Sequence, residues 1–284
     1  MNVSVLVEDT SSSPQYRCEH GLSLFIETKH RKILFDMGQT GLFLENADRM
    51  GVDVGAVDVA VLSHGHYDHG GGIPAFLVRN RSADVLVHPR VFEPHFSVRE
   101  GGHVAFIGLD PAVTANPRIK RAAEAQRLDT ELTIFSGVPA RTLWPPANRT
   151  LMKATPDGCE ADDFAHEQHL IVTEDGEDVL FTGCAHCGIV NILEAACALR
   201  GRAPRAVVGG FHLVLKEGPQ GGDASYAAQV AEALSRFDSS YYTGHCTGEG
   251  GVQLLKEKLG ERVHHLSTGI EFNPLDESEQ EGIS

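Results

Sequence analysis

The stretch His64-Gly65-His66-Tyr67-Asp68-His69 places four side chains that can bind a metal within six residues. It follows an apolar run, residues 57–63, with the composition of a buried strand. Side chains two residues apart in an extended segment share a face, so His64 and His66 can bind one ion together. Asp68 and His69 lie further round the turn and point elsewhere. The stretch therefore predicts two adjacent metal sites rather than one.

Chance is the alternative explanation, because the chain has 15 histidines in 284 residues and a single histidine is usually a surface or core residue. Four ligands in six residues after an apolar strand are much harder to obtain by chance. Gly65 and the glycines at 70–72 also give the backbone the freedom to bring all four side chains into one cavity.

The charge balance limits the partners. The net charge is −15, from 24 Lys and Arg against 39 Asp and Glu. A nucleic acid or an anionic membrane needs a basic surface, so we expect neither as the main partner. A small-molecule substrate fits better, an anionic one included, because two divalent cations make a locally positive site. The sequence gives no indication of the oligomeric state.

The compartment is predicted from the N-terminus and the cysteines. The N-terminus lacks the basic start and apolar stretch of a signal peptide. No apolar run is long enough to span a bilayer. The six cysteines form no regular disulfide framework. We therefore expect a cytoplasmic protein with mostly free thiols.

The periodicity predicts one domain over residues 1–284, of mixed α/β (α+β) class, built from two related halves. Two strand-rich halves with flanking helices imply a four-layer αββα sandwich. In the first half we expect strands at 3–7, 22–28, 32–36, 57–63 and 84–88, and helices at 40–50 and from 73. In the second half we expect strands at 169–173, 179–182, 206–208 and 241–243, and helices at 189–200, 225–237 and 252–259.

Residues 89–165 are less regular, because prolines interrupt the pattern. A helix over 118–127 and a strand over 132–135 are the expected elements. The segment is interpreted either as a surface loop region or as an insertion that forms a lid and selects the substrate. We slightly favour the lid.

The motif S-H-G-H-Y-D-H-G-G, residues 63–71, resembles the H-x-H-x-D-H signature of the metallo-β-lactamase superfamily. Further motifs follow the same order along the chain: E-H-G-L-S at 19–23, L-F-D-M-G at 34–38, T-G-C-A-H at 182–186, G-G-F-H-L at 209–213 and G-H-C-T-G at 244–248. The series is similar to the branch related to 7,8-dihydropterin-6-methyl-4-(β-D-ribofuranosyl)-aminobenzene-5′-phosphate synthase. The resemblance implies the αββα architecture, with metals at one edge between the sheets.

Two further histidines are expected to complete the sites. His186 follows a strand and a glycine, as His64 does, and is predicted to join His64 and His66. His245 is predicted to join Asp68 and His69. Each ion would then have three protein ligands and room for water, as catalytic zinc requires. Zn²⁺ is the expected metal at both sites, with Mn²⁺ and Fe²⁺ as alternatives.

The chain departs from the superfamily pattern at one point. Many members bridge the two metals with an aspartate at the end of a second-half strand, and Cys184 occupies that neighbourhood here. Either Cys184 replaces the bridge or water does. Cys184 and Cys187 also form a C-x-x-C, for which a redox pair is one reading. A closed structural zinc site is the other, and Cys246 and Cys159 are the plausible additional ligands.

Three more residues are candidates for the site. Asp36 is expected to orient a ligand histidine from its strand end. His212 is either a group that binds the substrate and stabilises a developing oxyanion, or a core histidine. His20 is a weaker substrate-binding candidate of the same kind.

The leading functional hypothesis is a metal-dependent hydrolase that uses a metal-bound hydroxide on an ester, phosphoester or related bond. Asp68 would hold one ion and help to orient the hydroxide. His66 stands where the oxygen-reducing di-iron relatives carry glutamate, which favours hydrolysis. A synthase or transferase of the pterin branch would share the same site. A non-catalytic protein that senses metal or redox state through Cys184 and Cys187 would bind metal without turnover.

Overall fold

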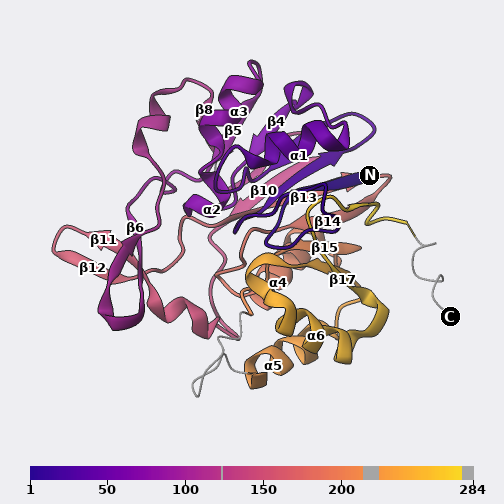
Figure 1. Cartoon of the computed structure of the whole chain (residues 1–284). Coiled ribbons are helices and arrows are strands. Elements are labelled where there is room, and N and C mark those ends of the chain that lie inside the picture. Colours follow the sequence, from indigo (N-terminus) through magenta and orange to yellow (C-terminus); the bar gives the residue numbers. More distant parts are fainter. Residues whose placement is uncertain (123, 214–223, 277–284) are drawn as a thin grey trace.

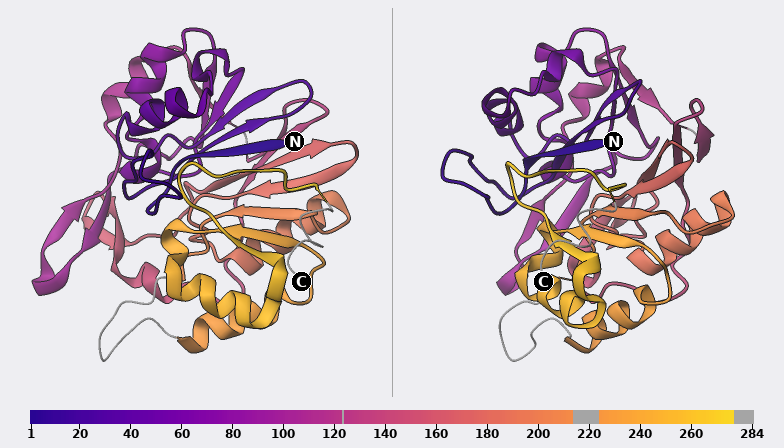
Figure 2. Two further views of the ribbon diagram at one scale, coloured as in Figure 1. Left: turned by 45° about the vertical axis from the view of Figure 1, so that its right-hand side comes forward. Right: turned by 90° about the vertical axis from the view of Figure 1, so that its right-hand side faces the viewer.

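The computed structural model describes residues 1–122, 124–213 and 224–276. Two large sheets pack face to face, and helices cover their outer faces (Figures 1 and 2). The predicted four-layer αββα sandwich is therefore confirmed.

The first sheet is built mainly from the first half of the chain. Its strand order is β18-β1-β2-β3-β4-β5-β8. Strands β2 and β3 form an antiparallel hairpin, and β3, β4, β5 and β8 run parallel. The parallel run brings the carboxyl ends of β3 and β4 to one edge. The bounds are β1 (Asn2–Val7), β2 (Ser23–Glu27), β3 (Lys32–Phe35), β4 (Val59–Val61), β5 (Asp84–Val87), β8 (Ile119–Arg121) and β18 (Glu271–Phe272).

The second sheet repeats this plan, with the order β17-β16-β15-β14-β13-β10-β9. Strands β13 and β14 form a hairpin, and β14, β15, β16 and β17 run parallel. The carboxyl ends of β14, β15 and β16 therefore also meet at one edge. The bounds are β9 (Ala125–Arg127), β10 (Leu132–Ser136), β13 (Gln168–Glu174), β14 (Glu177–Phe181), β15 (Ala206–Gly209), β16 (Ser240–Thr243) and β17 (Val263–His265).

Apolar side chains separate the four layers. Phe35 and Phe181 meet between the sheets, with ring centroids 6.1 Å apart. Phe43 packs the first group of helices on its sheet, and Leu193 does so for the second group. The α-helices are α1 (Leu42–Met50), α2 (Tyr67–Gly70), α3 (Ile73–Arg79), α4 (Ile189–Arg200), α5 (Ala224–Leu234) and α6 (Gly248–Leu259). The 3₁₀ helices are η1 (Val54–Ala56), η2 (Glu100–Gly102), η3 (Pro111–Ala115), η4 (Pro146–Thr150), η5 (His245–Thr247) and η6 (Gly260–Arg262).

Residues 89–165 are more regular than the sequence suggested. A separate sheet of order β12-β11-β6-β7 projects from the sandwich, at the left of Figure 1. Its strands are β6 (His95–Val98), β7 (Val104–Phe106), β11 (Leu151–Thr155) and β12 (Gly158–Ala161). Whether this segment acts as a lid stays a prediction.

The helix predicted over residues 118–127 is wrong. The chain instead adds β8 to the edge of the first sheet, beside β5, and β9 to the edge of the second, beside β10. The guanidinium of Arg118 donates to the carbonyl oxygens of Leu77 and Asn80, which fixes the entry to β8. Pairing with two open sheet edges outweighs the local helical preference.

Among the described residues, no helix has both the length and the apolar character needed to cross a lipid bilayer. The cytoplasmic location stays a prediction.

The buried carboxylate of Asp178 joins the β13–β14 hairpin to the end of α4. Its oxygens accept hydrogen bonds from Arg200 at 3.0 Å, from Arg202 at 3.2 Å and from Thr173 at 2.6 Å. Burial alone would raise the pKa of Asp178, but these donors bring it below its ordinary value of 3.8. Asp178 is therefore ionised in the folded protein.

We expect Asp178→Asn to lower the free energy of unfolding by about 1.5–3 kcal/mol at pH 7, the range for hydrogen bonds to charged groups. A lowered folded-state pKa stabilises above the unfolded-state value and loses its effect as the pH falls. The gap between wild type and variant should therefore shrink below about pH 4. Urea unfolding measures both quantities, with Glu177→Gln, an exposed neighbour on β14, as the control. A gap that did not change with pH would exclude the ionised carboxylate as its cause.

Candidate metal centre

Both sheets contribute residues to one edge. His64 follows β4, Cys184 and His186 follow β14, and His245 follows β16. Because the carboxyl ends of parallel strands lie together, residues far apart in the chain converge there. Four non-glycine residues at this edge have positive φ: Asp36 at 58°, Ala185 at 56°, His212 at 51° and His245 at 49°. Such strained conformations cluster at functional sites.

The first cluster contains His64, His66 and His186. The Nε2 atom of His64 lies 3.0 Å from Nδ1 of His66. The His186 ring centroid lies 4.9 Å from the centroids of both rings, and its Nε2 is buried without a hydrogen-bond partner. These three residues were predicted for the first ion. The potential ligand atoms of His64 and His186 group with Cys184, and those of His66 group with His95, Asp162 and His166.

The second cluster contains Asp68, His69 and His245. The Nε2 atoms of His69 and His245 lie 3.2 Å apart. Oδ2 of Asp68 lies 3.6 Å from the first and 3.4 Å from the second. These are the residues predicted for the second ion, and they adjoin the first cluster, since the ring centroids of His64 and His69 are 4.2 Å apart.

The outer nitrogen of each of four histidines is held by a fixed partner. Nδ1 of His69 contacts Asp36 at 2.6 Å, and Nδ1 of His245 contacts Asp9 at 2.6 Å. Nδ1 of His64 contacts Ser63, which in turn donates to Asp36. In the fourth pair, Nδ1 of His186 lies 3.0 Å from Oδ1 of Asn148. A histidine that donates from Nδ1 presents a bare Nε2 lone pair on its other side.

The bare nitrogens point at one another, which is an arrangement that a cation satisfies. Burial, and then the neighbouring imidazoles, lower the pKa of His64 and His186, so both rings are neutral. Burial alone would raise the pKa of Asp68, but His69 and His245 lower it, and the carboxylate is ionised. Neutral imidazoles and a carboxylate are the donor set of catalytic zinc sites.

His245 carries the charge that balances these carboxylates when no metal is bound. Burial lowers the pKa of His245, but hydrogen bonds to Asp68 and Asp9 raise it overall. A proton then takes the place of a cation between His245 and Asp68, and binding a metal would displace that proton.

Cys184 adjoins both clusters. It groups with Asp68, His69 and His245, and separately with His64 and His186. Its Sγ lies 3.2 Å from Nε2 of His69. This position between the two sites suits the bridging role considered for it.

The C-x-x-C does not assemble as a unit. Cys187 packs in the apolar layer under α4, and Cys159 is exposed on β12. Within the part of the chain that the structure describes, neither belongs to a group of potential metal ligands. Burial raises the pKa of both Cys184 and Cys187, whereas reactive thiols need a lowered pKa. The geometry therefore gives no support to a Cys184–Cys187 redox pair or to a closed zinc site that includes Cys187 and Cys159. Of the additional ligands considered, Cys246 alone lies near Cys184, in a group with His212.

The metal clusters form the floor of a cavity of about 410 Å³. His212 lines it, with its ring centroid 4.3 Å from that of His186 and both ring nitrogens unpartnered. His20 lines it too, half exposed, with Nδ1 2.8 Å from Asp9 and Nε2 3.4 Å from Asp68. The segment 89–165 supplies further lining residues: Ser97, Arg99, Ile107, Ala147, Thr150 and Leu151.

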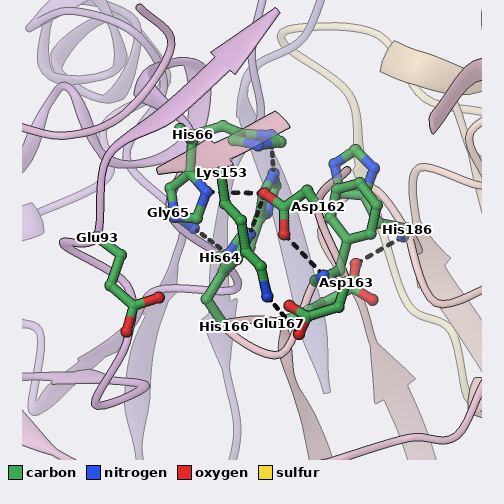
Figure 3. A network of polar contacts seen from close by, with 12 residues as sticks. His64, Gly65, His66, Glu93, Lys153, Asp162, Asp163, His166, Glu167 and His186 are labelled. Atoms are coloured by element: carbon green, nitrogen blue, oxygen red, sulfur yellow. Dashed lines mark hydrogen bonds and ion pairs between the residues drawn. The ribbon is translucent and has the colours of Figure 1, made fainter. Parts of the chain in front are cut away.

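The sequence interpretation missed several residues that contact the ligands. Asp9 follows β1 as Asp36 follows β3, a repeated signal that was available. Asn148 lies in η4, within a proline-rich stretch that gives no such signal. Glu167 accepts hydrogen bonds from the backbone N–H groups of His186 and Cys187 (Figure 3). Its position in the loop immediately before β13 did not distinguish it.

Residues 16–150 match the sequence model of the metallo-beta-lactamase superfamily. An uncharacterized protein of Methanocaldococcus jannaschii is 27% identical over 262 residues, which cover 90% of this chain and 94% of that protein. The 7,8-dihydropterin-6-methyl-4-(beta-D-ribofuranosyl)-aminobenzene-5′-phosphate synthase of the same organism is 27% identical over 301 residues, covering 95% of each chain. The crystal structure of a metal-dependent hydrolase of the beta-lactamase superfamily has a TM-score of 0.80 at 25% identity, covering 97% of this chain and 100% of that one.

Purified protein should carry between one and two divalent ions per chain, from the count of ligand sets above. Replacing both His64 and His66 with alanine should remove one ion and nearly all activity, because two of its three ligands are lost. Elemental analysis of the purified variant measures this. His30→Ala, a histidine exposed at the β2–β3 turn, is the control and should retain the wild-type metal content. Unchanged metal in the double variant would refute the ligand assignment.

Cys184→Ser should weaken metal retention, by at least about tenfold if the thiolate contacts an ion directly. Cys197→Ser, on α4, should have no effect on metal content. A competing chelator measures the affinity of each variant. Cys187→Ser tests the C-x-x-C: an effect equal to that of Cys184→Ser would restore the C-x-x-C as a functional pair. No effect from either would make Cys184 a bystander.

Proposed function

We propose that this chain, which belongs to the metallo-β-lactamase superfamily, is a metal-dependent hydrolase of a small anionic ester or phosphoester. The observation that carries the proposal is the convergence of bare imidazole nitrogens and an ionised Asp68 on the floor of an open cavity. Two divalent ions, Zn²⁺ by donor type, fit that arrangement.

When bound, the ions would supply Lewis acidity and make hydroxide available near neutral pH, since coordination lowers the pKa of water to about 7. The carboxylate of Asp68 faces the cavity and can orient the attacking water by accepting its hydrogen bond. The two unpartnered ring nitrogens of His212 make this side chain available to a developing oxyanion beside His186. His20, at the exposed side of the same cavity, is proposed to contact the substrate.

The anionic substrate is proposed from Arg99. Among the described residues that line the cavity, Arg99 is the only lysine or arginine, and its charge acts on the hydroxyl of Tyr67 in the metal motif. An exposed arginine that lines a site on a chain of net charge −15 can attract a phosphate or carboxylate specifically. We propose no nucleic-acid or membrane partner, because the surface charge opposes both.

A pterin-branch synthase is the second candidate, favoured by the similarity to the Methanocaldococcus jannaschii synthase along 95% of both chains. Its product, as named, carries a phosphate, which Arg99 could also bind. The two functions differ in outcome. A synthase yields the phosphorylated product that its name gives, whereas a hydrolase releases an alcohol or a phosphate.

A screen of metal-loaded protein against phosphodiesters, lactones, thioesters and pterin phosphates, read by mass spectrometry, separates these functions. On the substrate found, His212→Ala should lower kcat by about 10²–10³ with metal content intact. Arg99→Gln should raise KM by about tenfold or more for anionic substrates and leave neutral lactones unaffected. Arg127→Gln, exposed and outside the cavity, is the matched control.

Three results would count against this picture. Loss of an ion in His212→Ala would make that residue a ligand. Wild-type kinetics with a destabilised fold would make it a core histidine. A metal-loaded protein with no turnover in the screen would favour a binding protein.

A further inference from the structure

His66 differs from the other four histidines of the two clusters. Those four have an outer nitrogen held by Asp36, Ser63, Asn148 or Asp9. His66 faces its cluster through Nδ1, so its Nε2 is the outer atom. That Nε2 is buried and has no hydrogen-bond partner. His66 is therefore the one histidine of the two clusters whose outer nitrogen has no hydrogen-bond partner among the described residues.

His95, the first residue of β6, lies opposite this nitrogen. The rings of His66 and His95 meet edge to face, with centroids 5.7 Å apart and an interplanar angle of 77°. Nε2 of His95 is also buried without a partner. It lies against the backbone of the metal motif, because a Cβ atom added at Gly65 would be 3.0 Å from it. The two unpartnered Nε2 atoms therefore occupy one small buried region.

Asp162 fixes the proton on His95. Its Oδ2 lies 2.8 Å from Nδ1 of His95, and a carboxylate can only accept, so the proton is on Nδ1. Burial alone would raise the pKa of Asp162, but hydrogen bonds from His166 and His95 lower it, and it is ionised. Nε2 of neutral His95 is then a bare acceptor.

His166 closes the network on the far side of Asp162 (Figure 3). Its Nδ1 accepts the N–H of Gly65 at 3.0 Å, so its proton is on Nε2, which lies 3.4 Å from Asp162. All four side chains, His66, His95, Asp162 and His166, are buried. The network thus begins at the metal motif and returns to its backbone at Gly65, the residue before His66.

A metal bound at Nδ1 of His66 would leave the proton on Nε2, which would make that nitrogen a buried donor beside the unpartnered acceptor of His95. We propose that His95, oriented by Asp162 and anchored through His166, is a positioning residue that accepts this hydrogen bond and holds His66 for its ion. The proposal rests on the metal centre proposed above. It assigns to residues of the segment 89–166 a part in metal binding besides substrate selection.

An additional metal ion is the competing explanation, since the potential ligand atoms of these four residues lie within 4.8 Å of one another. The hydrogen bonds oppose it. Nε2 of His166 carries a proton, and the carboxylate of Asp162 already accepts from His95 at Oδ2 and from the Phe164 backbone at Oδ1. Only two nitrogens remain, fewer than the three protein ligands typical of catalytic zinc.

The test is the affinity for Zn²⁺ and Co²⁺, measured by chelator competition on the whole chain. His95→Phe keeps the ring but removes the acceptor, and should weaken one of the two ions by about 10–100-fold while the other is retained. His95→Gln offers a carbonyl oxygen to the same donor and should restore most of the loss. His169→Phe is the matched control, because His169 is a fully buried histidine that contacts Thr182 and Glu167 and belongs to no group of potential metal ligands among the described residues.

A second measurement separates positioning from general stability. In the Co²⁺-loaded protein, the exchangeable Nε2 proton of His66 should give a hyperfine-shifted NMR signal that persists in wild type and in His95→Gln but exchanges rapidly in His95→Phe. If His95→Phe does not fold, as judged by circular dichroism, Asp162→Asn serves instead and should weaken the same ion.

Each remaining outcome overturns the inference. Unchanged affinities in a folded His95→Phe, while wild type binds two ions, would refute the positioning role alone. A third ion in wild type that His95→Phe lacks would make the cluster a metal site. A wild-type chain that binds no ion would refute the metal centre and the positioning role together.

Discussion

Nitrogen lone pairs forced toward one another at a sheet edge are the constraint on which this structure depends. His69 and His245 each donate a hydrogen bond from Nδ1 to a carboxylate, and their Nε2 atoms lie 3.2 Å apart. Such an approach is unfavourable unless a proton or a metal ion stands between the atoms. The buried Asp36 and Asn148 and the solvent-exposed Asp9 keep the rings from turning away. The four-layer packing supplies the rigidity that holds all of them in place.

The sequence predicted the parts of this arrangement that are local. The spacing of His64, His66, Asp68 and His69 predicted that the two pairs of side chains point to two different sites. The strand–glycine–histidine pattern predicted His186. The order of strands and helices was enough for the four layers, because each half alternates regularly between them. These features depend on neighbouring residues, which a sequence displays directly.

The parts that could not be predicted depend on contacts across long sequence distances. Asp9 and His245 are separated by 236 residues, and His95 and Asp162 by 67, yet each pair shares a hydrogen bond. The periodicity of a sequence does not indicate hydrogen bonds between residues so far apart in the chain. The failed helix over residues 118–127 has the same origin, since its conformation is set by the edges of two sheets built from other segments. Cys187 shows the converse, where a short motif suggested a pairing that the packing of α4 does not permit.

The strand β18, residues Glu271–Phe272, pairs with β1 at the edge of the first sheet, so the two ends of the described chain lie side by side. Asp9 lies two residues after the end of β1, and it holds His245. The second ligand set is therefore incomplete until the segment that carries His245 has been synthesised. An ion cannot template the early stages of folding here, as it does in small zinc modules. The choice among competing cations is instead made by a preformed cavity, after synthesis, and reflects whichever metals are abundant where the finished chain resides.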